Sequence, residues 1–270
     1  MYELEYVRKR KRRRLVAIFG FVSTSVVTSL AIISFLGRYV GTFTVSLETR
    51  NVDLALSEKK ASDQHSSFLR VSAEAPFQEF TYSDFDRRFG DNVIDSESST
   101  VELGANYSEK EPDKIESFNF FKYTFYVENA GTLPAKYDFA LNILDDVLAD
   151  DGRSLLDTVR VTLYEDGVKT TYAKADTKPH YGEDGQPDYR APISVSEYEA
   201  TESYPFMGYA EEFASSEVVT TLSGKVLNVG DAKRYTIVTW LEGFRSDSNL
   251  SAPKGATIKL GVEINAYENE

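Results

Sequence analysis

The sequence feature that most restricts the fold is a repeated alternation of apolar and polar residues that begins after Tyr39. In AKYDFALNIL, every second residue from Ala135 to Ile143 is apolar. The segments TFTVSLE, NVDLALS and ATIKLGVEINAYE repeat this two-residue period, and FLRVSA shows a shorter version of it. In a β-strand, successive side chains point to opposite faces. A two-residue period therefore gives these segments one apolar face, and they predict strands with one buried face.

Two further segments, FNFFKYTFYVEN and RYTIVTWLEG, are apolar on both faces and predict central strands. The segment VRVTLYEDGVKTTYAK predicts a hairpin, because Asp166-Gly167 suits a turn that needs positive φ. Stretches rich in turn residues predict loops at 57–67, 90–113 and 176–191. Short helices are predicted at Asp145–Asp157, with Val147, Leu148, Leu155 and Leu156 inward, and at Ser194–Ala200.

The pattern predicts an all-β fold, an antiparallel β-sandwich of jelly-roll type. We count about eight to ten strands and find no helix long enough to cross between parallel strands. The chain has no cysteine, so the sandwich depends on its core, to which 17 Tyr, 17 Phe and one Trp contribute apolar area. We predict one domain over residues 38–270, with a long loop or insertion around 176–223.

An uncharged, largely apolar segment, Leu15–Gly37, precedes this domain. As a helix it would extend roughly 35 Å, enough to cross the hydrocarbon core of a bilayer. Only Arg38 is basic directly after this segment. The residues directly before it are all basic: Arg8, Lys9, Arg10, Lys11, Arg12, Arg13 and Arg14. The positive-inside rule therefore predicts a cytoplasmic tail (1–14), a transmembrane signal anchor (15–37) and an extracellular domain in a single-pass protein of the cell membrane.

A cleaved signal peptide is the alternative for this segment. Its apolar region is usually shorter than the run seen here, and it ends in a pair of small residues around the cleavage site. The sequence Ser34-Phe35-Leu36-Gly37 is a poor match to that pattern. We therefore favour the uncleaved anchor.

Charge is divided unequally between the two parts. Residues 1–38 hold eight basic and two acidic side chains, whereas the rest of the chain holds 22 basic and 41 acidic ones. An acidic body argues against nucleic acid as a partner, because neutralising phosphates requires Lys and Arg. The absence of Cys excludes disulfides and thiolate zinc sites, and two histidines are too few for a His-rich metal centre.

Catalytic motifs are missing: there is no G-x-S-x-G elbow, H-E-x-x-H, phosphate-binding Gly-rich loop or EF-hand loop. We therefore predict a non-enzymatic protein without a cofactor. His65 and His180 fall in polar loops and are interpreted as solvated. Calcium is considered at two acidic groups, although solvated loops are the favoured interpretation: Asp145, Asp146, Asp150, Asp151 and Asp157, and Glu183, Asp184 and Asp188.

An aromatic segment, YEATESYPFMGYAEEF, is a candidate binding surface for sugar or protein through Tyr198, Tyr204, Phe206 and Tyr209. Aromatic side chains are enriched at interfaces. Packing of this loop onto the sandwich is the competing interpretation.

Several segments in this order carry a family resemblance: GTFTVSL, YTFYVENAGTLPAKYDFALNI, VRVTLYEDGVKTTYAK and YTIVTWLEG. The chain resembles single-pass surface proteins of Gram-positive bacteria and, more distantly, the TasA/camelysin group of exported jelly-roll proteins. The resemblance covers most of residues 39–175 and 230–267. It implies a structural role at the cell envelope, with self or other envelope proteins as partners.

TasA-like proteins build matrix fibres in which an N-terminal strand of one subunit completes the sheet of the next. The matching segment here is Thr42–Glu48, with Phe43, Val45 and Leu47 on one face. Camelysin is described as a surface peptidase. The sequence of this chain contains no metal-ligand motif, so the resemblance assigns no catalytic residue to it. A ligand-binding or sensor module, for example for polysaccharide, and a surface hydrolase remain the alternative functions.

Overall fold

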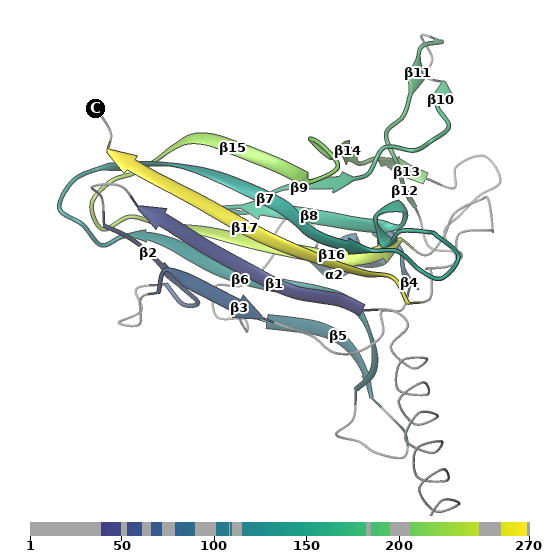
Figure 1. Cartoon of the computed structure of the whole chain (residues 1–270), viewed down its shortest axis with the longest axis horizontal. Helices are drawn as coiled ribbons and strands as arrows, with labels where there is room; N and C mark the ends of the chain where they lie inside the picture. Colours follow the sequence, from purple (N-terminus) through teal and green to yellow (C-terminus); the bar gives the residue numbers. More distant parts are fainter. Residues whose placement is uncertain are drawn as a thin grey trace, which may run out of the picture. The chain divides into compact units, whose positions relative to one another are not determined.

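The alternating segments pair into two main β-sheets, which share one apolar interior (Figure 1). The structure is a computed structural model, and it describes residues 39–49, 53–60, 66–71, 79–89, 101–107, 109, 115–181, 185–194, 206–242 and 255–268. All of these residues belong to one unit, Arg38–Glu270. The prediction of an all-β fold is therefore confirmed for the part of the chain that the structure describes.

The five-stranded sheet has the order β15-β7-β17-β1-β3. Its strands are β1 (Tyr39–Thr49), β3 (Phe68–Val71), β7 (Ala135–Val147), β15 (Val218–Leu227) and β17 (Thr257–Glu268).

The eight-stranded sheet has the order β14-β9-β8-β16-β6-β2, with β4 beside β16 and β5 beside β6. Its strands are β2 (Leu54–Ser57), β4 (Glu79–Phe80), β5 (Val101–Tyr107), β6 (Ile115–Asn129), β8 (Val159–Glu165), β9 (Val168–Ala173), β14 (Glu211–Glu212) and β16 (Ala232–Glu242). Two small ladders complete the fold: β10 (His180–Tyr181) with β11 (Pro187–Asp188), and β12 (Pro192–Ser194) with β13 (Phe206–Tyr209).

Both main sheets are mixed, which corrects the prediction of a purely antiparallel sandwich. Most ladders are antiparallel, but β1 pairs with β17, β14 with β9 and β4 with β16 in parallel. A parallel pair needs a long connection between its strands, and the whole sandwich lies between β1 and β17 along the chain. Local sequence pattern does not show such pairings, because it defines the faces of a strand and not its neighbour.

The interior is built from the predicted inward faces. Along β7 the residues from Ala135 to Ile143 alternate between buried and partly exposed, and β17 buries Ile258, Leu260, Val262 and Ile264. The strands β6 and β16 are buried on both faces, as their sequences predict. The central rings stack on one another, with Phe139 4.6 Å from Tyr235 and Phe125 5.7 Å from it between ring centroids.

The predicted hairpin at residues 159–174 is confirmed. β8 and β9 pair antiparallel through the two-residue turn Asp166-Gly167, with φ values of 48° and 92°. Both values lie in the left-handed region that a type I′ turn requires, and Asp-Gly is a preferred pair for it.

A short helix, α2 (Tyr82–Phe89), covers the outer face of the eight-stranded sheet, and the sequence pattern did not predict it. Its Phe85 is fully buried and stacks on Trp240, with ring centroids 4.4 Å apart. The second apolar cluster that they form includes Phe120, Tyr164 and Val238. Burial of β6 and β16 on both faces thus results from a covering element outside the sandwich core.

The predicted helix at Asp145–Asp157 is wrong. β7 continues to Val147, and only Leu155–Asp157 forms a single 3₁₀ turn. Val147 and Leu148 are exposed, whereas Leu155 and Leu156 are buried. The predicted helix at Ser194–Ala200 begins in β12, and its remaining residues lie outside the described part.

Two of the predicted loops contain strands. β5 lies within 90–113, and β10 and β11 form a small ladder within 176–191 that stands away from the main sheets in Figure 1. The stretch 176–223 also includes β12, β13, β14 and the start of β15. These strands are mostly short, and short strands leave little periodic signal in a sequence.

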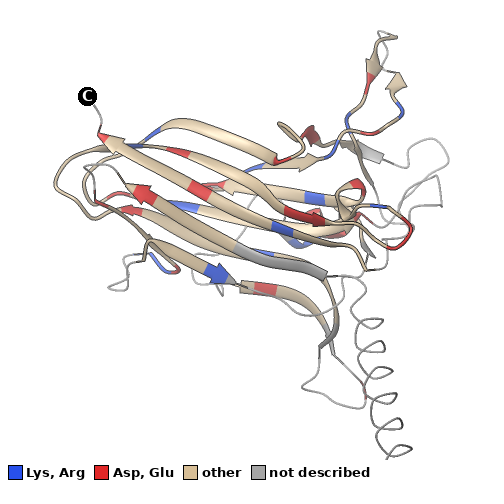
Figure 2. Ribbon diagram, viewed as in Figure 1, with Lys and Arg blue, Asp and Glu red and all other residues tan. Residues whose placement is uncertain are grey.

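The predicted membrane segment Leu15–Gly37 lies outside the described residues. Among the residues that are described, no helix has the length and apolarity needed to cross a membrane. Acidic and basic side chains are interspersed over the sheets (Figure 2).

Candidate functional site

The strand β1, which contains the predicted exchange segment, lies between β17 and β3. Its parallel register with β17 runs from Tyr39 opposite Thr257 to Thr49 opposite Ala266, with an irregularity between Val40 and Phe43. On the other side, β3 pairs with it only from Phe43 to Ser46. Beyond that ladder, one further backbone bond joins the Leu47 N–H to the carbonyl of Ser67, at 3.0 Å.

β1 fills a place in the core as well as in the sheet. Val45 is fully buried and Leu47 is 7% exposed, as the predicted inward face requires. Phe43 takes part in the backbone ladders, and its side chain lies outside the described part. Burying each of the two side chains contributes about 1.5–3 kcal/mol, and the parallel ladder adds its backbone hydrogen bonds.

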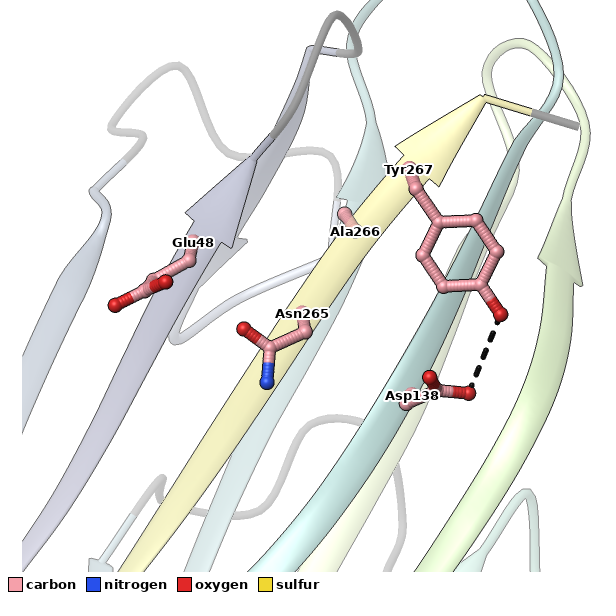
Figure 3. Close-up of a pocket in the computed structure, with 5 residues that line it drawn as sticks. All are labelled: Glu48, Asp138, Asn265, Ala266 and Tyr267. Carbon is pink, nitrogen blue, oxygen red and sulfur yellow. Dashed lines mark hydrogen bonds between the residues drawn. The ribbon is translucent and has the colours of Figure 1, made fainter.

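A hollow opens on the outer face of the five-stranded sheet, beside the end of β1 (Figure 3). Its volume is about 340 Å³, and we call it the outer hollow; it is lined by Glu48, Asp138, Asn265, Ala266 and Tyr267. Glu48 faces Asn265 in the β1–β17 ladder, and Asn265 faces Asp138 in the β17–β7 ladder. The three polar side chains therefore form one row across three neighbouring strands.

Hydrogen bonds fix part of the outer hollow. Asp138 accepts from the backbone N–H of Gly224 at 2.7 Å and from the hydroxyl of Tyr267 at 3.3 Å, both at Oδ1. The Asn265 amide donates to Glu263 at 3.1 Å. Desolvation raises the pKa of Tyr267, and the charge of Asp138 raises it further, so the phenol remains a donor at neutral pH.

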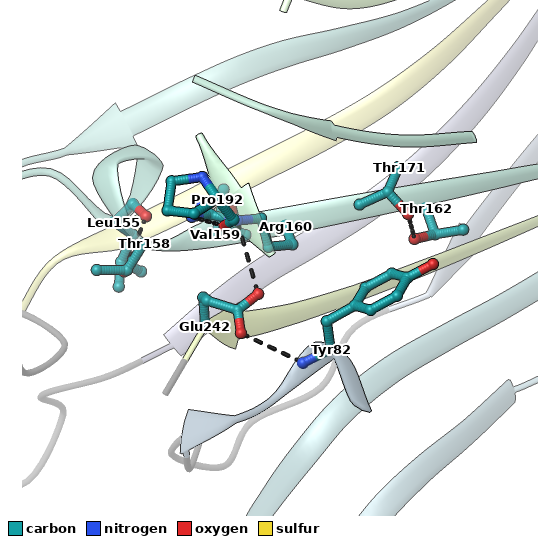
Figure 4. Close-up of polar contacts among 9 residues, drawn as sticks. All are labelled: Tyr82, Leu155, Thr158, Val159, Arg160, Thr162, Thr171, Pro192 and Glu242. Atoms are coloured by element: carbon teal, nitrogen blue, oxygen red, sulfur yellow. Dashed lines mark hydrogen bonds and ion pairs between the residues drawn. The ribbon is translucent and has the colours of Figure 1, made fainter. Parts of the chain in front are cut away.

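A buried ion pair lies on the outer side of the eight-stranded sheet (Figure 4). The side chains of Arg160 and Glu242 are both fully buried, with Nε 3.7 Å from Oε2. Arg160 also donates to the carbonyl of Pro192 at 3.0 Å, and Glu242 accepts the backbone N–H of Tyr82 at 3.2 Å. The pair therefore connects β8 and β16 to β12 and to the start of α2, which is a structural role.

A second charged group lies on the same outer side. Lys122 is 1% exposed and donates to Glu102 at 3.1 Å, and Arg88 of α2 bonds the other oxygen of Glu102. Desolvation acts to raise the pKa of Glu102, but the bonds from Arg88 and Lys122 outweigh it and hold the pKa below its usual value.

The predicted aromatic surface is only partly described. Tyr198 and Tyr204 lie outside the described residues, and so does the side chain of Phe206. Tyr209 stacks on His180, with ring centroids 3.7 Å apart and an interplanar angle of 2°. The Arg190 guanidinium lies 5.6 Å from the centre of the Tyr209 ring.

His180 is not simply solvated, because Asp188 lies 3.0 Å from its Nε2. Asp188 also receives a bidentate interaction from Arg190, and this hydrogen bonding holds its pKa well below the usual range. These contacts engage the ring of Tyr209 and tie the β10–β11 hairpin to β13.

The acidic residues considered for calcium are mostly engaged with separate partners. Asp145 pairs with Lys259, Asp151 with Arg153 and Asp157 with Lys174. Asp146 accepts from the hydroxyl of Ser154. In the described part of the chain, no three His, Cys, Asp or Glu residues come together as a metal-binding group. Glu183 and Asp184 lie outside it.

Comparison with known proteins identified no relative of this chain. No protein-family model matches the chain, and a search of curated proteins found no match. The basic residues Arg8 to Arg14, predicted as a topology signal, lie outside the described residues.

Proposed function

We propose that this chain is a non-enzymatic surface protein of the cell envelope, single-pass and anchored by residues 15–37, whose jelly-roll-like body associates with other copies by exchanging β1. The single observation that carries the proposal is the position of β1. It takes part in both a sheet and the apolar core. Its main neighbour in the sheet is β17, and all the other described strands lie between β1 and β17 along the chain.

The pairing of β1 can be supplied by another copy without changing any contact. A β1 strand from a neighbouring chain would bury the same Val45 and Leu47 and form the same parallel register with β17. Such exchange forms dimers at low energetic cost, because the contacts of the exchanged element are the same in both states. The proposed anchor ends at Gly37 and β1 begins at Tyr39, so the exchanged strand follows the anchor closely in the sequence.

Cysteine cross-linking tests the exchange, because the natural chain contains no cysteine. Ser46 of β1 lies opposite Glu263 of β17. One full-length copy carries S46C with one affinity tag, and a second full-length copy carries E263C with another tag. After co-expression and mild oxidation of intact membranes, we expect a covalent dimer that carries both tags, since paired strand positions have a separation that a disulfide can bridge.

The matched control replaces E263C by T221C, which lies on β15 at the far side of the same sheet. This pair should not cross-link between copies. A chain that carries both S46C and E263C shows that the pair reacts within one copy. If that chain cross-links internally while the two-copy pair yields no mixed dimer, β1 stays in its own chain and exchange is wrong.

The anchor is tested separately by fractionation and by mapping the N-terminus of the full chain. We expect the chain in the membrane fraction with residues 1–14 retained. External protease should degrade the body and leave an epitope before Arg8 intact. A mature chain that begins near Tyr39 and is found in the medium would contradict the permanent anchor.

A further inference from the structure

The outer hollow has the geometry of a ligand site that is independent of the exchange of β1. Glu48, Asn265 and Asp138 stand in one row across three strands. Neighbouring strands lie roughly 4.8 Å apart, so the row extends across about 10 Å of sheet surface. Three oxygen-bearing side chains at these intervals can bind a molecule that carries several polar groups along its length.

An aromatic ring borders this row. Tyr267 lies two residues beyond Asn265 on β17, and its hydroxyl donates to Asp138 at 3.3 Å. Figure 3 shows the ring held beside Asp138, with one broad face toward the viewer. The hydrogen bond restricts the direction of the ring. Tyr267 is partly exposed, and the exposed surface of an aromatic ring can pack against apolar C–H groups.

Several acceptor atoms in the outer hollow remain unused within the described part of the chain. Both bonds to Asp138 end on Oδ1, so Oδ2 is open. Asn265 uses its NH₂ group toward Glu263, which leaves its Oδ1 open. The carboxylate of Glu48 is exposed and forms no hydrogen bond or ion pair with a described residue. A ligand must therefore offer hydrogen-bond donors.

The charges define the ligand further. Glu48, Asp138 and Glu263 form no ion pair with a described residue, and Lys136, opposite Tyr267 on β7, is the nearby basic position in the ladder. The resulting negative field repels anionic polymers. The volume of about 340 Å³ lies at the small end of ligand sites, which suits one or two sugar rings.

We propose that the outer hollow binds a neutral saccharide. One sugar ring packs its C–H face on Tyr267, and its hydroxyl groups donate to Asp138, Asn265 and Glu48. Three of the four named side chains stay in one chain whichever copy supplies β1, so this proposal can succeed or fail separately from strand exchange. It also places a sugar site away from the aromatic segment around Tyr204 and Tyr209.

The test is a binding titration of the full-length chain, purified in a detergent without a sugar headgroup. The probes are a neutral β-glucan hexamer, a neutral α-glucan hexamer, an amine-bearing chitosan hexamer and an anionic hyaluronan hexamer. We expect saturable binding of at least one neutral hexamer and none of hyaluronan. The neutral binding should persist at high salt, because it does not depend on exposed charges.

Variants locate the site. Y267A should weaken binding roughly tenfold or more, equivalent to ~1.4 kcal/mol. Y267F keeps the ring and should retain most of the binding, and D138N should lose affinity because one acceptor becomes a donor. The matched control is Y181A, which removes a tyrosine that is 69% exposed on the β10–β11 hairpin, and it should bind like the parent chain. Thermal melting confirms that each variant is folded.

Three results overturn the proposal. The first is that no neutral hexamer binds. The second is that only chitosan binds and is released by salt, which shows simple charge attraction to an acidic body. The third is that Y267A binds normally while Y181A does not, which places any sugar site on the hairpin instead.

Discussion

The hydroxyl oxygens of Tyr137 and Tyr235 lie 2.8 Å apart across the interior, so one hydrogen bond joins the five-stranded sheet to the eight-stranded sheet. Both side chains are fully buried. Each hydroxyl is therefore the partner that keeps the other satisfied in an apolar interior, where an unpaired polar group is costly. Burial raises the pKa of Tyr137 to about 12, although its bond to Tyr235 acts in the opposite direction.

Removing one hydroxyl of this pair should destabilise the fold more than removing both. Y235F leaves the Tyr137 hydroxyl buried without its partner, and we expect a loss of about 1–3 kcal/mol in the free energy of unfolding. The double variant Y137F/Y235F should lose less stability than either single variant, because it leaves no buried hydroxyl without a partner. Chemical denaturation of all three checks this, and strictly additive losses would contradict coupling of the two hydroxyls.

Alkaline pH should destabilise the protein through the same pair. In the unfolded chain tyrosines ionise near pH 10, whereas the folded pKa of Tyr137 is about 12 and that of Tyr235 is raised further. The unfolded state therefore releases protons first, and stability present below pH 10 falls as the pH rises toward 12. Denaturation at a series of pH values should show this fall, and Y137F/Y235F should reduce its slope.

Breaking the buried pair of Arg160 and Glu242 should loosen α2. The variant E242Q removes the charge that faces Arg160, and breaking such a pair costs about 3–5 kcal/mol because a buried charge remains uncompensated. Glu242 also holds the backbone N–H of Tyr82. Hydrogen exchange should therefore speed up in Tyr82–Phe89 more than in β7, and equal changes in both would contradict a local role.

Glu102 should support stability at neutral pH and lose this effect in acid. Its folded pKa lies below the usual value, so the contribution is present above the unfolded pKa and disappears as the pH falls through the folded pKa. E102Q should destabilise the chain at pH 7 by about 1–3 kcal/mol, because Lys122 remains buried beside a neutral group. It should also flatten the loss of stability below about pH 4.5, which denaturation in acid measures.

The turn between β8 and β9 offers a backbone test. Gly167 has φ of 92° and open space where a Cβ would stand, so any cost of G167A comes from the backbone conformation alone. We expect about 1 kcal/mol of lost stability by thermal or chemical denaturation. A variant G167A that unfolds at the same denaturant concentration as the parent chain would contradict a conformational cost at this position.

Strands and their buried faces were predictable where the alternation is long. β7 and β17 show it most clearly, because a single face of each meets the core and every second residue had to be apolar. The hairpin tip Asp166-Gly167 was predictable for a local reason, since its conformation depends on two residues only. By contrast, α2 has only eight residues, and its apolar positions Tyr82, Phe85 and Phe89 stand at helical spacing over too short a window to distinguish a helix from a loop.

The outer hollow could not be predicted from the sequence. Glu48 and Asn265 are brought together by the parallel register of β1 and β17, and Asp138 joins the row through the separate ladder between β17 and β7. The pattern showed that both residues point outward but did not show that the first strand lies beside the last. The aromatic segment gives a stronger sequence signal, because its rings lie close together in the sequence, whereas no other aromatic residue lies near Tyr267 in the last strand.

The parallel pairing of β1 with β17 also determines the order in which the body can fold. Ser46 donates to the carbonyl of Val262, 216 residues away in the chain. Contacts at such separation form slowly, because the intervening chain must be ordered before they are gained. During synthesis β1 emerges before the other described strands, and β17 emerges after all of them. Val45 and Leu47 therefore remain without the cover of β17 until that strand has been made, and the proposed exchange would give another copy of the chain this interval in which to bind β1.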